Sequence, residues 1–253
     1  MCIRDRHRIV ELGADVIGNY DTSSLKVILV AGSALSPDLS ERVQDLFGDV
    51  LYNMYGSTEC AIASVATPQE LRAAPGTAGR APVTCEVVLY DEHDQRVKGS
   101  NRRGRIFVRN GAPFEGYTDG RHKQVIDGYM STGDMGHFTD NGLLFVDGRD
   151  DDMIVSGGEN VFPQEVENLL ESRDDVAEVA VVGVDDDEFG KRLRAFIVPE
   201  PGAELDAAEI KQFVKDNLAR HKVPRDVIVV DDLPRNATGK LLRRVLVEMK
   251  VDS

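Results

Sequence analysis

Residues 25–48, "LKVILVAGSALSPDLSERVQDLFG", read as a strand, a turn of small residues and a helix. The apolar run at the start is typical of a strand buried in a parallel sheet. Ser36 is suited to cap the helix, Pro37 to occupy its first position and Gly48 to end it. The helix has one apolar face, formed by Leu39, Val43, Leu46 and Phe47. The stretch therefore predicts a β-α unit of an α/β fold.

A second strand is expected directly after this unit, in "VLYNMYG" at residues 50–56. It leads into the polar cluster "GSTE" at residues 56–59. Open α/β sheets place ligand sites on the turns that follow their strands. We therefore expect a ligand site here, although an ordinary turn would have the same composition.

The pattern of the sequence changes twice more along the chain. From about Val83, short strands alternate with Gly, Asn and Asp turns, which predicts a small β-barrel or sheet. After Arg149, amphipathic helices and strands predict a compact α+β unit, and "GRDDD" is suited to an exposed linker before it. The expected fold class is α/β, with a partial α/β domain, a β-barrel subdomain and a separate α+β domain. The expected bounds are 7–148 for the first domain (α/β portion 7–80, barrel 81–148), 149–152 for a hinge and 153–253 for the C-terminal domain.

We expect part of the first domain to lie upstream of this sequence. A buried strand needs neighbours, and too few residues precede Leu25 to supply them. The opening "MCIRDR" also resembles translated sequencing-adapter sequence, and it has no amphipathic pattern that continues into the next segment.

Composition limits the class of partner. The 253 residues carry a net charge of −14, which argues against nucleic acid as a main partner because phosphate backbones bind basic surfaces. Three scattered cysteines, Cys2, Cys60 and Cys85, indicate neither a disulfide framework nor a zinc site, and a reducing cytoplasm fits best. No apolar run has the length of a membrane span, and no signal-peptide core opens the chain.

The Gly239-Lys240 pair in "PRNATGK", residues 234–240, first suggests a phosphate-binding P-loop. That motif requires a Gly five positions before Gly239 and a Ser or Thr after the Lys. Pro234 and Leu241 occupy those positions, so the P-loop interpretation fails. Taken alone, Lys240 would be a surface lysine that follows a loop.

Four polar clusters in order resemble the adenylate-forming superfamily of acyl-CoA synthetases, luciferases and peptide-synthetase adenylation domains. They are "YGSTE" (55–59), "STGD" (131–134), "GRDDDMIVSGGEN" (148–160) and "PRNATGK" (234–240). The resemblance implies an enzyme that uses ATP, Mg²⁺ and CoA to convert a carboxylic acid to an acyl-AMP and then a thioester. Lys240 would enter the active site during adenylation, where an ammonium group lowers the repulsion between carboxylate and phosphate.

The resemblance also implies roles for residues of the first domain. Tyr55 would stack on adenine, Thr58 would bind the α-phosphate, and Glu59 would hold Mg²⁺ and, with Thr58 and Lys240, act in catalysis. Asp134 would accept hydrogen bonds from the ribose hydroxyls, and Arg149 would contact ribose or phosphate. The remaining ATP- or AMP-binding candidates are Gly32, Ser33, Ala34 and Gly56. Each cluster taken alone could equally be a turn, a cap or a solvated surface residue.

A second half-reaction is implied for the C-terminal domain. After acyl-AMP forms, this domain would rotate about a hinge at Asp151 and withdraw Lys240. The loop of Gly157, Gly158 and Glu159 would then line the tunnel for CoA, since glycine allows close approach. Without the resemblance, the two glycines would be an ordinary turn.

The wording of "GYTDGRHKQVIDGYMSTGDMG" and "MIVSGGENVFPQEVE" is most similar to bacterial fatty acyl-CoA synthetases, so a medium- or long-chain fatty acid is the expected substrate. Any membrane association would then come only through that substrate. An aryl or short-chain acid-CoA ligase is the near alternative, and a peptide-synthetase module is disfavoured because no carrier sequence follows Lys240.

The family's phosphate-gripping loop is absent, so this chain alone is expected to be inactive. A non-catalytic binding module is the alternative from another class. Arg105 stands where the family usually has an acid.

Overall fold

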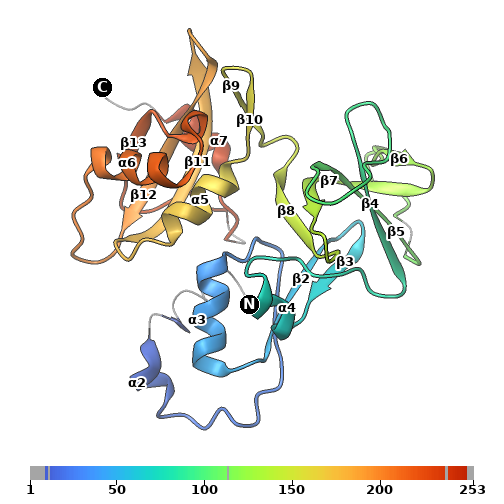
Figure 1. Cartoon of the computed structure of the whole chain (residues 1–253), viewed down its shortest axis with the longest axis horizontal. Coiled ribbons are helices and arrows are strands. Elements are labelled where there is room, and N and C mark those ends of the chain that lie inside the picture. The colour runs from blue at the N-terminus through green and yellow to red at the C-terminus, as the bar shows by residue number, and fades with distance from the viewer. Residues whose placement is uncertain (1–8, 11, 113, 237–238, 250–253) are drawn as a thin grey trace. The chain divides into compact units, whose positions relative to one another are not determined.

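The computed structural model describes residues 9–10, 12–112, 114–236 and 239–249. The chain divides into two compact units, Met1–Asp150 and Asp151–Ser253. Figure 1 shows an α/β portion and a curled β-sheet in the first unit, and helices packed on a sheet in the second. Among the described residues, no helix is both long and apolar enough to cross a membrane.

The first unit begins with a three-stranded sheet and its helices. The order of the strands is β1-β2-β3, with β1 and β2 parallel and β3 antiparallel to β2. The elements are α2 (Gly13–Ile17), β1 (Ile28–Ala31), α3 (Pro37–Phe47), β2 (Leu51–Ser57), β3 (Ala61–Ala66) and α4 (Pro68–Ala73). The expected β-α unit is therefore confirmed.

The ends of α3 follow from its sequence. The Ser36 hydroxyl accepts a hydrogen bond from the Leu39 backbone N–H at 3.4 Å, and Pro37 occupies the first turn. Gly48 ends the helix with φ of +76°, a left-handed conformation that favours glycine. The apolar face packs into a core with β1 and β2 that contains Val30, Leu35, Leu39, Val43, Leu51 and Leu71.

Strand β1 is less enclosed than its apolar sequence suggests. Within the described part of the chain it pairs only with β2, so it lies at the edge of the sheet. Val30 is fully buried, whereas the neighbouring Leu29 is 47% exposed on the other face. One face of the strand thus forms core and the other remains open.

The second half of the first unit is a curled five-stranded antiparallel sheet, as the sequence predicted in outline. Its order is β4-β5-β7-β6, and β8 pairs with β7. The strands are β4 (Cys85–Tyr90), β5 (Gly104–Asn110), β6 (Val125–Ile126), β7 (Tyr129–Phe138) and β8 (Leu144–Arg149). Strand β7 was not expected, although it is the longest of the five and holds Asp134 in its interior.

The second unit has the expected α+β composition. Strands β11, β12 and β13 form one sheet in that order, β9 and β10 form a separate hairpin, and α5 and α6 share a core with β11 and β12. The elements are β9 (Ile154–Ser156), β10 (Glu159–Val161), α5 (Pro163–Glu171), β11 (Val176–Asp186), β12 (Gly190–Pro199), α6 (Ala207–Asn217), the 3₁₀ turn η1 (Arg220–Lys222), β13 (Asp226–Val229) and α7 (Arg243–Glu248). Helix α6 ends at Asn217 because Leu218 is extended.

A buried ion pair fixes α7 within the second unit. Glu167, on α5, is only 3% exposed, and its carboxylate accepts hydrogen bonds from both terminal nitrogens of Arg243 at 2.7 and 2.9 Å. The same carboxylate accepts the Val181 N–H at 2.7 Å, and Arg243 donates to the Val181 carbonyl at 2.7 Å. All of these contacts are charge-assisted, so the start of α7 is firmly attached to α5 and β11.

Candidate functional site

The turns after β1 and β2 open at one edge of the sheet. Because the two strands are parallel and Ala31 lies opposite Met54, Gly32, directly after β1, and Tyr55, near the end of β2, lie at the same end of the sheet. Gly32 has φ of +82° and begins the turn into α3 that also contains Ser33 and Ala34. The structure therefore brings Gly32, Ser33 and Ala34 to the same edge as the "YGSTE" cluster.

Gly56 has a packing reason to be glycine. A side chain at this position would lie 1.9 Å from the carbonyl oxygen of Ala61, across the irregular start of the β2–β3 hairpin. The turn itself holds Thr58, which is exposed, and Glu59. The Glu59 N–H donates to the Ser57 hydroxyl at 3.2 Å. A tight turn thus presents two polar side chains, and the nucleotide roles of Gly56 and Thr58 stay predictions.

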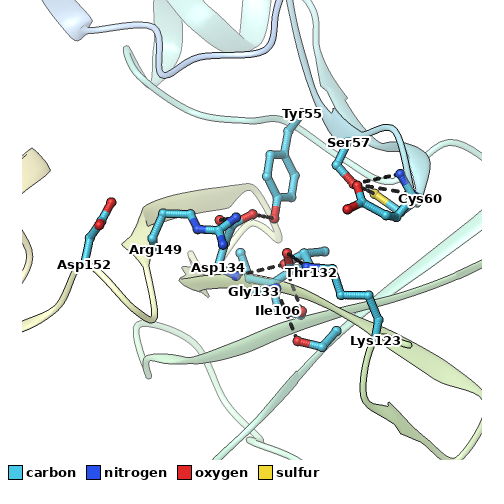
Figure 2. Close-up of polar contacts among 12 residues, drawn as sticks. Tyr55, Ser57, Cys60, Ile106, Lys123, Thr132, Gly133, Asp134, Arg149 and Asp152 are labelled. Carbon is cyan, nitrogen blue, oxygen red and sulfur yellow. Dashed lines mark hydrogen bonds and ion pairs between the residues drawn. The ribbon is translucent and has the colours of Figure 1, made fainter. Parts of the chain in front are cut away.

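Tyr55 and Asp134 connect the α/β portion to the curled sheet. The Tyr55 hydroxyl donates to an Asp134 carboxylate oxygen at 2.6 Å (Figure 2). Burial, reinforced by the nearby carboxylate, raises the pKa of Tyr55 well above its ordinary value. Burial also raises the pKa of Asp134, although the hydrogen bond from Tyr55 and the charge of Arg149 oppose that rise. The carboxylate is thus held in a partly dry position, with one oxygen already engaged.

Arg149 approaches Asp134 from the neighbouring strand. The two residues lie directly opposite each other in the β7–β8 pair, and Arg149 Nη1 is 3.7 Å from Asp134 Oδ1. The guanidinium group is about half exposed, whereas the side chain of Asp134 is 17% exposed. A cation at the open end and a carboxylate beneath it can together hold a polar, anionic ligand.

Glu59 is held by a residue that the sequence analysis did not select. The Tyr117 hydroxyl donates to Glu59 Oε1 at 2.5 Å. This hydrogen bond is the main cause of the lowered pKa of Glu59, and the charge of Lys123 adds to it. Glu59 therefore remains an ionised carboxylate.

Tyr117 and Lys123 were missed because they belong to a segment without regular structure. Residues 114–124 contain no helix or strand and give no periodic signal. The Asp127-Gly128 pair that follows could have revealed the β6–β7 hairpin, since both residues have positive φ in a two-residue turn. That hairpin would have placed residues 123–124 beside β7.

The expected CoA-binding residues form a turn in the second unit. Gly157 and Gly158 connect β9 to β10 with φ of +59° and +85°, as a two-residue hairpin of this type requires. The Gly157 N–H donates to the Phe189 carbonyl at 3.0 Å, and Glu159 begins β10 with an exposed side chain. Asp151 is exposed at the start of the unit. The hinge and CoA roles stay predictions.

Lys240 lies in a hairpin-like loop of the second unit. Its backbone N–H donates to the Asn236 side chain at 2.8 Å, and the Asn236 N–H donates to the Lys240 carbonyl at 2.9 Å. Arg235 donates to the Gly239 carbonyl at 3.0 Å and pairs with Glu178 at 2.7 Å. Gly239 has φ of +82°. The backbone of Lys240 is therefore bonded to Asn236 through both its N–H and its carbonyl, while its side chain is exposed.

A magnesium ion would find one candidate ligand here. Within the described residues, no group of three or more His, Cys, Asp or Glu side chains could hold a metal by itself. Mg²⁺ commonly binds through one or two carboxylates together with substrate phosphates and water. The ionised Glu59, exposed turn and nearby cations fit that mode, in which most ligands come from the nucleotide.

Comparison with known proteins places both units in one family. Residues 6–118 match the AMP-binding enzyme family, and residues 165–240 match the AMP-binding enzyme C-terminal domain. The chain is 40% identical over 225 residues to the indoleacetate–CoA ligase of Aromatoleum aromaticum. The aligned region covers 87% of this chain and 44% of that protein. It is 30% identical over 238 residues to the long-chain-fatty-acid–CoA ligase of Bacillus subtilis, covering 93% of this chain and 42% of that protein.

Solved structures agree with these matches. The amide bond synthetase McbA from Marinactinospora thermotolerans is 28% identical with a TM-score of 0.88, covering 96% of this chain and 50% of that one. The o-succinylbenzoate CoA synthetase from Bacillus subtilis, in complex with its acyl-adenylate intermediate, is 30% identical with a TM-score of 0.83, covering 94% and 49%. The chain thus spans about half the length of the proteins it matches. In sequence and in fold, it belongs to the adenylate-forming family of AMP-binding enzymes, whose members here include acid-CoA ligases.

Proposed function

We propose that this chain is part of an ATP-dependent carboxylate-CoA ligase that forms an acyl-AMP and then an acyl-CoA. The observation that supports it most is the meeting of Tyr55, Asp134 and Arg149, from three strands, beside the turn that holds Glu59. A non-catalytic binding module, the alternative considered above, would have no chemical need for these three residues together with Lys240. Relatives named as CoA ligases point to the same reaction.

In the first half-reaction, the first unit would bind the nucleotide. The ring of Tyr55 would stack on adenine, and Asp134 Oδ1, the oxygen that Tyr55 does not bond, would accept from the ribose. Arg149 would neutralise negative charge at the open end, and Thr58 would donate to the α-phosphate. Mg²⁺ held through Glu59 would neutralise the phosphates and orient pyrophosphate as the leaving group.

Lys240 would supply the cation needed when two anions react. Attack of the substrate carboxylate on the α-phosphate brings like charges together, and an ammonium group at that point stabilises the transition state. The loop built by Asn236 and Gly239 would present this side chain without changing its own backbone. For thioester formation, rotation at Asp151 would replace Lys240 with the Gly157-Gly158 turn, where CoA would enter.

The substrate acid has two candidates. The sequence wording favours a medium- or long-chain fatty acid, and a relative with that activity in its name is 30% identical. An aryl-substituted acid is the second candidate, because the relative named for indoleacetate is 40% identical over a similar span. Because the identity to the indoleacetate ligase is higher, the aryl acid is at least as well supported as the fatty acid.

The test uses the full-length protein that contains this chain. ATP-pyrophosphate exchange and thioester release should be measured separately, with a series of straight-chain fatty acids and a series of arylacetic and arylpropanoic acids. We expect exchange with one series and a thioester only when CoA is added. The 253-residue chain alone should give no acyl-AMP, since it spans less than half the length of the CoA ligases it matches. Nucleotide binding by the full-length protein without exchange on any acid would instead support the binding-module alternative.

A further inference from the structure

Two positively charged groups converge on the same point above Gly133. A methyl group added to this glycine would lie 3.3 Å from Arg149 Nη2 and 3.5 Å from Lys123 Nζ. Gly133 has φ of +86°, and as a glycine it places no side chain of its own beside the two cations. Figure 2 shows them reaching the Thr132–Asp134 segment from opposite sides. Two like charges held this close are stable when an anion lies between them.

The position of Lys123 is fixed by its neighbour in the chain. The Ser131 N–H donates to the Gln124 carbonyl at 2.8 Å, which attaches this segment to β7. Arg105 donates to the Gln124 side chain at 3.1 Å and to the Asp91 carbonyl at 2.6 Å, which attaches it to the turn after β4. Arg105, whose role the sequence could not indicate, therefore holds the segment that carries Lys123.

The ammonium group has donors to spare for a ligand. Lys123 Nζ donates to the Thr132 carbonyl at 3.3 Å, a long hydrogen bond, and a lysine has three N–H donors. Its charge adds to the Tyr117 hydrogen bond in lowering the pKa of Glu59, and it opposes the rise that burial causes in the pKa of Asp134. Lys123 is thus near enough to both carboxylates to influence them, and it is half-buried.

We infer that Lys123 is a second phosphate-binding cation of the nucleotide site and contacts the α-phosphate together with Arg149. The inference rests on the proposed function, in which Asp134 takes the ribose and Glu59 takes the metal on the outer phosphates. The α-phosphate is bonded to the ribose on one side and to the β-phosphate on the other. The α-phosphate would therefore lie between Asp134 and Glu59. Because Lys123 is close to both carboxylates, its ammonium group would contact this phosphate and not the outer ones.

The test compares AMP with adenosine, which differ by this one phosphate. Both should be titrated by calorimetry into the full-length protein that contains this chain, into its Lys123→Gln variant and into a matched control, Lys98→Gln. Lys98 is exposed on the same unit, so the control makes the same charge change away from Gly133. Lys123→Gln should weaken AMP binding by roughly ten- to a hundredfold, the usual loss for a hydrogen bond to a charged group. Adenosine binding should not change, Lys98→Gln should leave both affinities as they are, and Lys123→Arg should recover most of the AMP affinity.

Three results would overturn the inference, each in a different way. Unchanged AMP affinity in Lys123→Gln, with AMP still preferred to adenosine, would show that another group holds the phosphate and would leave the proposed function intact. An equal loss for both ligands, with a lowered melting temperature, would mean that Lys123 only supports β7 through Thr132. No binding of either ligand to the unchanged full-length protein would remove the nucleotide site itself, and with it the proposed function of this unit.

Discussion

Breaking the buried pair of Glu167 and Arg243 should destabilise the second unit severely. Glu167→Ala removes the carboxylate that accepts three hydrogen bonds, two from Arg243 and one from Val181. The guanidinium group of Arg243, whose side chain is 26% exposed, then keeps the Val181 carbonyl at 2.7 Å and Asp152 at 3.7 Å as contacts. A buried charge without its counterion is far more costly than the intact pair is stabilising.

The magnitude follows from the burial. Removing one partner of a buried ion pair costs about 3–5 kcal/mol. A unit of about 100 residues has a total stability of about 5–15 kcal/mol, and each kcal/mol shifts its melting temperature by about 4–8 °C. Glu167→Ala should therefore lower the melting temperature of the second unit by more than about 10 °C. Replacing both partners by Met should restore most of the loss, because no unpaired charge remains.

The next residue of α7 supplies the control. Arg244 pairs with Glu248 at 3.6 Å, but the two side chains are 90% and 67% exposed, so Glu248→Ala should change stability little. Hydrogen exchange measured by mass spectrometry on peptides from β11 and β12, at increasing urea, reports on this unit alone. If Glu167→Ala and Glu248→Ala had the same small effect, the reasoning on the buried pair would be refuted.

Three further predictions concern the reaction. In the full-length protein, Lys240→Ala should abolish pyrophosphate exchange but spare thioester formation from acyl-AMP supplied ready-made; equal loss of both would contradict the assigned role. Asp151→Pro fixes φ near −65° and should slow thioester formation far more than adenylation, so normal CoA transfer in this variant would exclude the hinge. Tyr55→Phe removes a donor to the Asp134 carboxylate, so the pKa of Asp134 should rise further and AMP affinity should start to fall at a higher pH as the solution is acidified. An NMR titration of the Asp134 carboxyl carbon in the presence and absence of AMP measures this, and an unchanged pKa would mean that the hydrogen bond has no influence.

Local signals in the sequence predicted the elements that they specify. Ser36, Pro37 and Gly48 predicted both ends of α3, and short apolar runs marked the strands of the second unit. The Thr67-Glu70 capping box of α4 was present as well, with each residue bonded to the backbone N–H of the other, but it was overlooked. Strand β7 could not be found in this way, because glycines at 133 and 136 interrupt its pattern.

The candidate site was predictable only in part, for a different reason. Tyr55 and Asp134 are 79 positions apart and meet through β2 and β7, a contact that no local pattern encodes. The family resemblance identified Tyr55 and Asp134 as site residues. Tyr117 and Lys123 lie in an irregular segment, and only their contacts with Glu59 and Thr132 in the structure identify them. The pairing of strands that are far apart in the sequence brings these residues together. Composition and periodicity are local properties, so they do not predict that pairing.

The open edge of β1 has a consequence for handling this chain at the bench. Within the described residues β1 is paired on one side only, so its outer backbone groups and the exposed Leu29 offer a template to any other extended chain, including a second molecule in the same arrangement. Self-association through such an edge depends on concentration, so light scattering should rise steeply as the chain is concentrated. A charged substitution such as Leu29→Lys would oppose this self-association and leave the buried face at Val30 unchanged. The chain would then stay monomeric at higher concentration.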